Sequence, residues 1–149
     1  MAAELPEHPG RVIARLARQV ELAAATVELT LSQYRALSLL GDGKEAASAL
    51  ADKLAVSRPS VTGVIDGLVA RGLVERHHDD GDRRRIGLHL TVDGGRVLAA
   101  AEEEVERRLR DIAAYSSEPA FEGLGPWKQA LDAYRAARRS GAPSAGAAV

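Results

Sequence analysis

The chain has 149 residues, a formal net charge of −1 and no cysteine. This length fits one ordinary domain or one small domain with helical extensions, and the missing cysteine excludes disulfides, thiolate zinc sites and cysteine nucleophiles. The near-zero charge means that any nucleic-acid site must be local. The first ten residues lack the basic and apolar regions of a signal peptide, and there is no 18-residue apolar run, so we expect a cytoplasmic protein that does not bind membranes.

The N-terminal part is predicted to be helical. Residues 1–10 contain two prolines and a glycine and are expected to form a flexible lead-in. Apolar residues then recur at helical spacing from Arg11 to about Leu29, which predicts a long amphipathic helix. Either Thr30 or Ser32 can cap a second helix, which the glycines at 41 and 43 would end.

Two shorter helices are expected next. Residues 45–55, EAASALADKLA, are rich in alanine and leucine and predict a third helix. Ser57 is a candidate cap for a fourth, with Pro59 in its first turn, where a missing N–H group costs nothing. This helix is expected to run to about Ala70, and Gly72 is its predicted C-terminal stop.

The pattern then changes to that of strands. LVERHH (73–78) and RRIGLHL (84–90) are typical of two short strands, and the DDGD between them is a turn signal. The sequence therefore predicts a β-hairpin.

The remainder is again helical. Thr91 is a candidate cap for a long helix over 95–114, whose apolar residues share one face. A loop is expected over 115–125, and Pro126 begins a last helix. The final ten residues, 140–149, are of low complexity and predicted to be disordered.

This order predicts a mainly α fold with a small β-hairpin wing. A winged helix-turn-helix core over 32–91 is flanked by helical regions over 11–31 and 92–139. The flanking helices carry apolar stripes that need a partner, which is either each other or the same helices of a second copy.

The fourth helix is the candidate recognition helix. Its apolar residues Val61, Val64, Ile65 and Leu68 share one face and are expected to pack inward. A recognition helix reads base edges in the major groove with its N-terminal residues, and the free N–H groups at its start can hold a phosphate. The predicted DNA-binding residues of this helix are Ser57, Arg58, Pro59, Ser60, Thr62, Gly63 and Asp66.

Several short motifs follow one another at a specific spacing. SRPSVT (57–62) precedes LVARGLVER (68–76), then comes a D-x-x-D-R-R turn (79–84), and the second strand ends in Leu90-Thr91. Together they resemble the winged-helix core of the MarR family of transcriptional regulators, and the helix order extends the resemblance to about residues 11–139. The resemblance implies an intertwined homodimer. In it 32–91 is the DNA-binding domain, the helices of 11–31 and 92–139 form the dimerisation region, and each protomer places one recognition helix in a major groove. It also implies repression that small ligands or oxidation relieve.

The stretch HHDDGDRRR (77–85) has two interpretations. Its histidines and aspartates look like metal ligands, whereas its arginines suit a nucleic-acid groove. Neighbouring side chains of a strand point to opposite faces, so His77 and His78 cannot easily bind one ion together. His77 and Asp79 could, but nothing in the sequence fixes a third ligand. We therefore interpret the stretch as the wing and predict no metal site and no cofactor.

The resemblance assigns roles to the wing arginines. Arg83 is the candidate for the minor groove, where a narrow groove concentrates negative potential. Arg84 is expected to pair with Asp82 and shape the wing, and Arg85 to touch phosphate. Residues 57–91 carry six arginines against five acids, so the acids must point away from DNA or orient the arginines.

Two glycines depart from the family pattern. Many members carry a basic residue where this chain has Gly63, and another near Gly67. One interpretation is close approach of the helix backbone to DNA, and the other is weaker anchoring on phosphates.

A small effector is a further expected partner. Tyr34 and Tyr115 are candidates for a pocket that takes phenolic ligands, as the family often does, and Arg15 for recognition of an anionic ligand. The alternative is that both tyrosines belong to the core and Arg15 to a solvated face. Trp127, the single tryptophan, is predicted to anchor the dimer core.

No enzyme motif is present, since there is no phosphate loop, H-E-x-x-H or G-x-S-x-G. The leading hypothesis is a ligand-responsive homodimeric repressor that binds double-stranded DNA at an inverted-repeat operator. An alternative is a dimeric ligand-binding or protein-interaction module that has lost strong DNA binding. A metal-dependent enzyme using His77, His78 and Asp82 is the weakest hypothesis.

Overall fold

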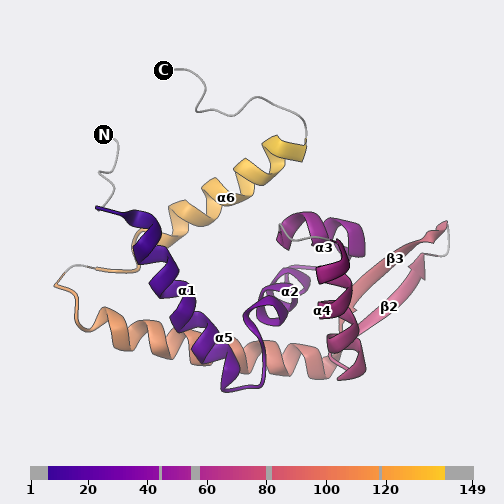
Figure 1. Cartoon of the computed structure of the whole chain (residues 1–149), viewed down its shortest axis with the longest axis horizontal. Helices are drawn as coiled ribbons and strands as arrows, with labels where there is room; N and C mark the ends of the chain where they lie inside the picture. The colour runs from indigo at the N-terminus through magenta and orange to yellow at the C-terminus, as the bar shows by residue number, and fades with distance from the viewer. Residues whose placement is uncertain (1–6, 44, 55–57, 80–81, 118, 140–149) are drawn as a thin grey trace. The chain divides into compact units, whose positions relative to one another are not determined.

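A computed structural model describes residues 7–43, 45–54, 58–79, 82–117 and 119–139 (Figure 1). The elements in chain order are α1 (Pro9–Ala25), α2 (Leu31–Gly41), β1 (Glu45–Ala46), α3 (Ala47–Leu54), α4 (Arg58–Ala70), β2 (Val74–Asp79), β3 (Asp82–Leu90), α5 (Val92–Ala113) and α6 (Leu124–Arg139). The predicted order of four helices, a hairpin and two helices is confirmed, with β1 added. None of the helices in the described ranges combines the length and the apolar character needed to cross a membrane.

The chain forms two compact units, Met1–Leu109 and Arg110–Val149. The first holds α1 to α4, the sheet and most of α5, and the second holds the end of α5 and α6. The expected flexible lead-in and the expected disordered tail fall mostly outside the described residues, because 1–6 and 140–149 are not among them.

The first helix ends four residues before the predicted Leu29. Glu28 adopts a left-handed backbone with φ of 59°, and the N–H of Leu29 donates to the carbonyl of Ala24 at 3.1 Å. This is the hydrogen bond that closes a helix at a left-handed C-terminal residue. Leu29 fits the apolar spacing of the predicted helix because it is buried in the core, but it lies beyond the end of α1.

The second helix has a capping box. Thr30 Oγ1 accepts from the N–H of Gln33 at 3.2 Å, and the Gln33 side chain accepts from the N–H of Thr30 at 3.0 Å. Of the two predicted caps, Thr30 is therefore the one used, and the two side chains together satisfy two backbone N–H donors.

The hairpin belongs to a three-stranded antiparallel sheet of order β1-β3-β2. Glu45 and Ala46 of β1 pair with Leu88 and Gly87 of β3, so the prediction that the third helix begins at residue 45 was wrong by two residues. Alanine and glutamate have little intrinsic preference for strands. The strand forms because this segment reaches the free edge of β3.

The core of the first unit joins the helices to the sheet. Its largest fully buried side chains are Leu37, Leu50, Leu68, Val74 and Leu88. They come from α2, α3, α4, β2 and β3, so α4 and the hairpin share one core.

Candidate nucleic-acid interface

The fourth helix has one buried face and one exposed face. Val61, Ile65 and Leu68 are buried and Val64 is half-buried, as the spacing predicted. The predicted DNA-binding residues whose exposure the structure describes all lie on the exposed face: Pro59, Ser60, Thr62, Gly63 and Asp66. The core therefore holds this helix from behind and leaves its polar side open.

The start of this helix bears on phosphate binding. Ser57 lies outside the described residues. Arg58 is the first residue of α4, but the structure does not describe its side chain. The first N–H groups of a helix have no partner within the helix and carry a partial positive charge. In a helix of 13 residues these groups form an end that favours an anion.

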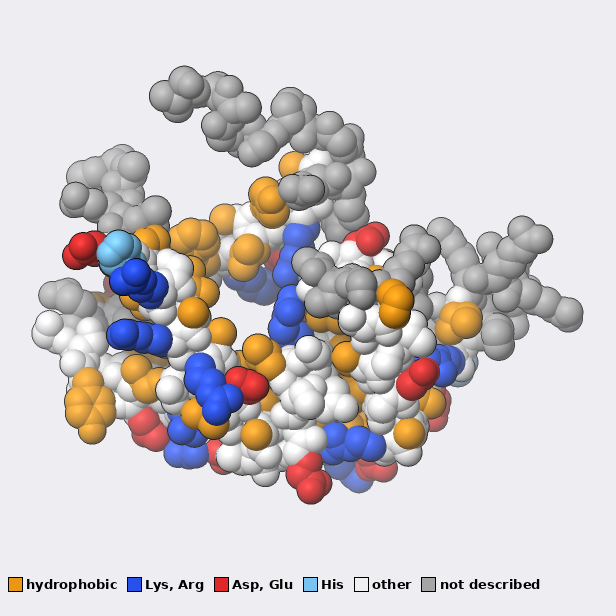
Figure 2. All heavy atoms as spheres, viewed as in Figure 1, with side chains coloured by type: hydrophobic (Ala, Val, Ile, Leu, Met, Phe, Trp, Pro, Cys, Tyr) orange, Lys and Arg blue, Asp and Glu red, His pale blue; other side chains and the backbone are white. Residues whose placement is uncertain are grey.

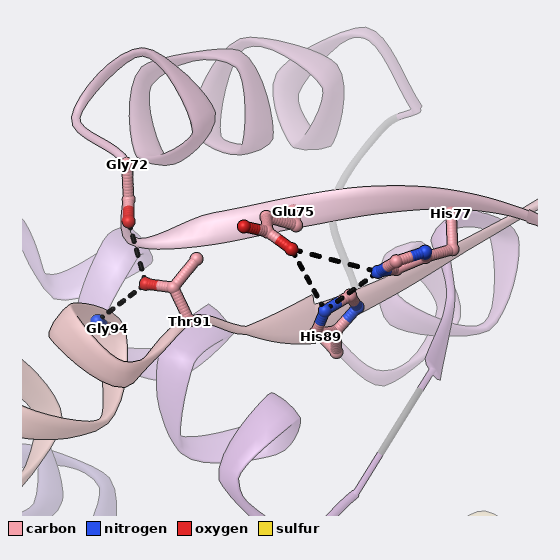
Figure 3. A network of polar contacts seen from close by, with 6 residues as sticks. All are labelled: Gly72, Glu75, His77, His89, Thr91 and Gly94. Atoms are coloured by element: carbon pink, nitrogen blue, oxygen red, sulfur yellow. Dashed lines mark hydrogen bonds and ion pairs between the residues drawn. The ribbon is translucent and has the colours of Figure 1, made fainter.

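The other end of α4 is fastened to the hairpin and to α5. Gly72 has a φ of 69°, and the N–H of Leu73 donates to the carbonyl of Leu68 at 3.0 Å. Thr91 Oγ1 donates to the carbonyl of Gly72 at 2.7 Å and accepts from the N–H of Gly94 at 2.9 Å (Figure 3). The predicted helix stop at Gly72 and helix cap at Thr91 are confirmed, and they meet in one hydrogen-bonded cluster.

An ion pair links α4 to the wing. Arg76 of β2 donates to the carboxylate of Asp66 on α4. Arg76 was not among the predicted site residues, and its position on the strand face of buried Val74 was the available signal, since alternate residues share a face. The pair offsets the negative charge that Asp66 would otherwise present on the exposed face of α4.

The two glycines of α4 have different surroundings. A Cβ added at Gly63 would meet no atom within 4 Å, whereas one at Gly67 would lie 3.4 Å from Nε2 of Gln33 on α2. Gly67 therefore faces another helix, and only Gly63 lies on the open surface that a basic residue would occupy.

The wing arginines lie in an irregular part of β3. The pairing register shifts between His78 and Asp79, whose partners are Ile86 and Asp82. Arg83, Arg84 and Arg85 occupy the stretch of β3 between those two partners. Bulged strands bend and re-aim their side chains, and the side chains of 82–85 lie outside what the structure describes.

The three predicted effector residues differ in their surroundings. Tyr34 on α2 is half-buried against the core, and burial raises the pKa of its hydroxyl above the usual value, against the effect of a hydrogen bond with Ser38. Arg15 is exposed on α1. Tyr115 follows α5 in the second unit and is 95% exposed.

A hollow of about 310 Å³ lies between α3, α4 and the hairpin. Its lining is mainly apolar, with one polar or charged side chain each from α3, α4 and the hairpin. The residues that line it are Ser48, Ala51, Val61, Thr62, Ile65, Arg76 and Ile86.

Comparison with known proteins identifies the family. Residues 28–85, which include α2 to α4 and most of the hairpin, match the model of the MarR family. A putative transcriptional regulatory protein for the hcr operon of Thauera aromatica is 34% identical over 120 residues, covering 79% of this chain and 72% of that relative. The chain belongs to the MarR family of transcriptional regulators.

Solved structures of similar regulators agree with this. The transcriptional repressor CouR, bound to a 23-mer DNA duplex, is 28% identical, with a TM-score of 0.65 and 88% of each chain covered. NadR in complex with 4-hydroxyphenylacetate is 29% identical, with a TM-score of 0.65 over 93% of this chain and 95% of that one. The predicted winged helix-turn-helix fold of this MarR-family regulator is thereby confirmed.

Proposed function

We propose that two copies of this regulator bind one inverted-repeat operator, each with α4 in a major groove and its wing in the adjacent minor groove. The observation that carries the proposal is the exposed polar side of α4, held from behind by the core and fastened at its end to the hairpin. The similarity to CouR, which was solved on a DNA duplex, supports the same docking here. A two-fold symmetric dimer predicts half-sites about one helical turn apart.

Each part of the surface has a proposed role. Arg58, Ser60 and Thr62 reach base edges, because they lie at the start of α4. Arg83 enters the minor groove. The remaining predicted site residues contact phosphate or shape α4 and the wing. They are Ser57, Pro59, Gly63, Asp66, Arg84 and Arg85.

The second copy covers apolar surface that one chain leaves exposed. On α1, Val12, Ile13 and Leu16 are 45%, 61% and 39% exposed, and on α6, Trp127 is 56% exposed. Hydrophobic side chains are visible along both helices in Figure 2. Exposed apolar patches of this kind mark interaction sites, which supports the dimerisation role proposed for 11–31 and 92–139.

A small organic effector is proposed to release the DNA. The similarity to NadR, which was solved with an aromatic acid, supports a ligand of that class, with Tyr34, Arg15 and Tyr115 as its proposed contacts. An effector that binds best when the two recognition helices are wrongly spaced for DNA lowers operator affinity by shifting the population of states. Repression relieved by such a ligand is therefore the proposed mode of action.

The test is selection of binding sites from a randomised duplex pool, followed by fluorescence anisotropy on the selected site and a scrambled site at several salt concentrations. We expect an inverted repeat, preferred binding to the selected site, and a log–log salt slope of several units, since each phosphate contact contributes roughly 0.9. Arg83→Ala should weaken binding to both duplexes. Arg18→Ala, which removes the same charge from α1, is the matched control and should leave binding unchanged.

If the pool yields no preferred sequence and all duplexes bind equally weakly, the alternative is favoured, namely a ligand-binding or protein-interaction module that has lost strong DNA binding. Equal affinities and salt slopes of Arg83→Ala and Arg18→Ala would remove the proposed role of Arg83.

A further inference from the structure

We propose that Glu75, His77 and His89 form a binding site for a divalent transition-metal ion of the Zn²⁺, Ni²⁺ and Co²⁺ class, on the wing hairpin (Figure 3). The site is additional to the proposed DNA interface and does not depend on it. Sequence reasoning considered His77 with His78, Asp79 or Asp82 as metal ligands and predicted no site. It did not consider Glu75 or His89, because His89 follows His77 by twelve residues on the other strand.

The strand register brings the three residues together. Glu75 of β2 pairs directly with His89 of β3, and His77 pairs with Gly87. Residues two apart on a strand share a face, so His77 lies beside Glu75 and diagonally opposite His89. Because Gly87 has no side chain, the space opposite His77 is open and its ring can lie against that of His89.

The cluster lies on the sheet face that points away from α4. Val74 and Leu88 are buried, and Arg76 reaches Asp66 on α4, so these alternate residues define the inner face. Glu75, paired with His89, occupies the opposite face by alternation. A bound ion would therefore leave the exposed side of the recognition helix free.

The donor atoms are close enough to share one ion. Nε2 of His77 and Nε2 of His89 are 2.8 Å apart, and Oε2 of Glu75 lies 3.3 Å from the latter and 3.7 Å from the former. Two zinc–nitrogen bonds of about 2.0–2.1 Å at a tetrahedral angle would separate the nitrogens by roughly 3.3 Å. The rings are stacked, with centroids 4.0 Å apart and planes 27° apart. Binding one ion therefore needs the nitrogens to separate by about half an ångström and the exposed His77 ring to rotate, so that both in-plane lone pairs point at the ion.

The donor chemistry selects the class of ion. Two imidazole nitrogens and one carboxylate suit Zn²⁺ and its neighbours, whereas Mg²⁺ and Ca²⁺ prefer oxygen ligands throughout. The site is also open, since the His77 and Glu75 side chains are 61% and 60% exposed. Three protein ligands on an exposed surface leave the remaining positions to water.

The same three side chains can also interact without a metal ion. Two imidazole nitrogens at hydrogen-bond distance can share one proton between them, and the carboxylate beside them favours a cation at that point. A metal ion would replace that proton and gain all three ligands. A purely hydrogen-bonded cluster is the alternative, and metal titration distinguishes the two.

The experiment is titration of the untagged, metal-free full chain with Co²⁺, followed by visible absorption, and with Zn²⁺, followed by calorimetry. We expect one ion per chain and a saturable Co²⁺ ligand-field spectrum. Binding should weaken as the pH falls through the range in which histidine protonates, because protons compete for the nitrogens. Zn²⁺ should also raise the unfolding temperature, since it binds only the folded site.

Variants identify the ligands. His77→Ala and His89→Ala should each lower metal affinity by at least about tenfold, because even loss of a supporting residue typically costs that much. His8→Asn removes a histidine from the start of α1, where φ is 54°, and asparagine tolerates that backbone. This control should bind metal like the natural chain, and circular dichroism establishes that each variant is folded.

Two results would overturn the proposal. One is the absence of saturable binding of Zn²⁺, Ni²⁺ and Co²⁺ by the folded natural chain. The other is binding that the folded His77→Ala and His89→Ala variants retain in full. Both readouts use the ion alone, so they stand whether or not the chain binds an operator.

Discussion

The hydroxyl of Thr91 lies 2.7 Å from the carbonyl oxygen of Gly72 and donates a hydrogen bond to it. Gly72 ends α4, the proposed recognition helix, and Thr91 begins α5, so one side chain ties the two helices together. The same oxygen accepts from the N–H of Gly94, which caps α5. A recognition helix must hold its orientation to read base edges, and this cluster holds one end of it.

We expect Thr91→Val to lower the free energy of unfolding by about 1–3 kcal/mol. The change keeps the size of the side chain but removes both the helix cap and the bond to Gly72. Urea unfolding at one fixed protein concentration measures the effect. Thr91→Ser keeps the hydroxyl and should recover most of the loss. A Thr91→Val protein as stable as the natural one would show that the hydroxyl does not hold the two helices.

Gly94 and Gly95 are neighbours in sequence but differ in structure. A Cβ at Gly94 would lie 1.9 Å from the carbonyl oxygen of Leu73, whereas one at Gly95 would meet no atom within 4 Å. We expect Gly94→Ala to destabilise the fold by about 3 kcal/mol or more, because backbone atoms must move apart.

The control for that prediction is Gly95→Ala. It should stabilise the protein by up to about 1 kcal/mol, the gain of alanine over glycine in a helix. Thermal unfolding of both variants gives the comparison. Similar changes in both would mean that α5 does not approach Leu73 as closely as the structure shows.

Local signals in the sequence predicted the elements that depend on neighbouring residues. The buried side of α4, the stop at Gly72 and the cap at Thr91 all follow from spacing and from the preferences of single residues. Nothing local distinguishes Gly94 from Gly95, because the constraint comes from Leu73 on another segment.

Features that depend on strand register could not be predicted in this way. Strand β1 exists because residues 45 and 46 reach β3, and the cluster of Glu75, His77 and His89 exists because one register aligns two strands. A shift of one residue would send these side chains to opposite faces. Sequence reasoning noticed His77 but had no means to pair it with His89.

Gly63→Lys tests the two interpretations of the glycines in α4. Because space around Gly63 is open, we expect the lysine to be tolerated, to tighten DNA binding, and to steepen the salt slope by roughly 0.9 for one added phosphate contact. Gly63→Ala adds a methyl group without charge and should leave affinity unchanged. Weaker binding by both variants would show instead that the helix backbone approaches DNA too closely for any side chain.

The proposed dimer predicts that a charge on α1 separates the two copies. Ile13 is 61% exposed in one chain, so Ile13→Glu should spare the fold of each subunit but place a charge in the dimer interface, which is costly. Sedimentation velocity should show a dimer for the natural chain and a monomer for the variant. Ala70→Glu, at an exposed position of α4 outside the proposed dimerisation region, should remain dimeric. Equal masses for the two variants would contradict the role of α1.

Trp127 gives an independent measure of the same assembly. It is the only tryptophan and is 56% exposed in the single chain, so covering by a second copy should shift its emission to shorter wavelength. We expect the Ile13→Glu monomer to emit at longer wavelength than the natural dimer. Identical spectra at concentrations where sedimentation shows both states would place Trp127 outside the interface.

Asp66 is the acid whose removal we expect to strengthen DNA binding. It lies on the exposed side of α4 and pairs with Arg76, and both side chains are substantially exposed, so the pair contributes at most about 1 kcal/mol to stability. Asp66→Asn removes a negative charge from the recognition side and releases Arg76 toward phosphate. Affinity for selected and scrambled duplexes should rise together, and the salt slope should steepen by roughly one unit.

Glu21→Gln, which removes a similarly paired acid from α1, is the control and should change neither the affinity nor the salt slope. If Asp66→Asn instead lost its preference for the selected site, the carboxylate would be reading a base edge, as a cytosine amino group allows.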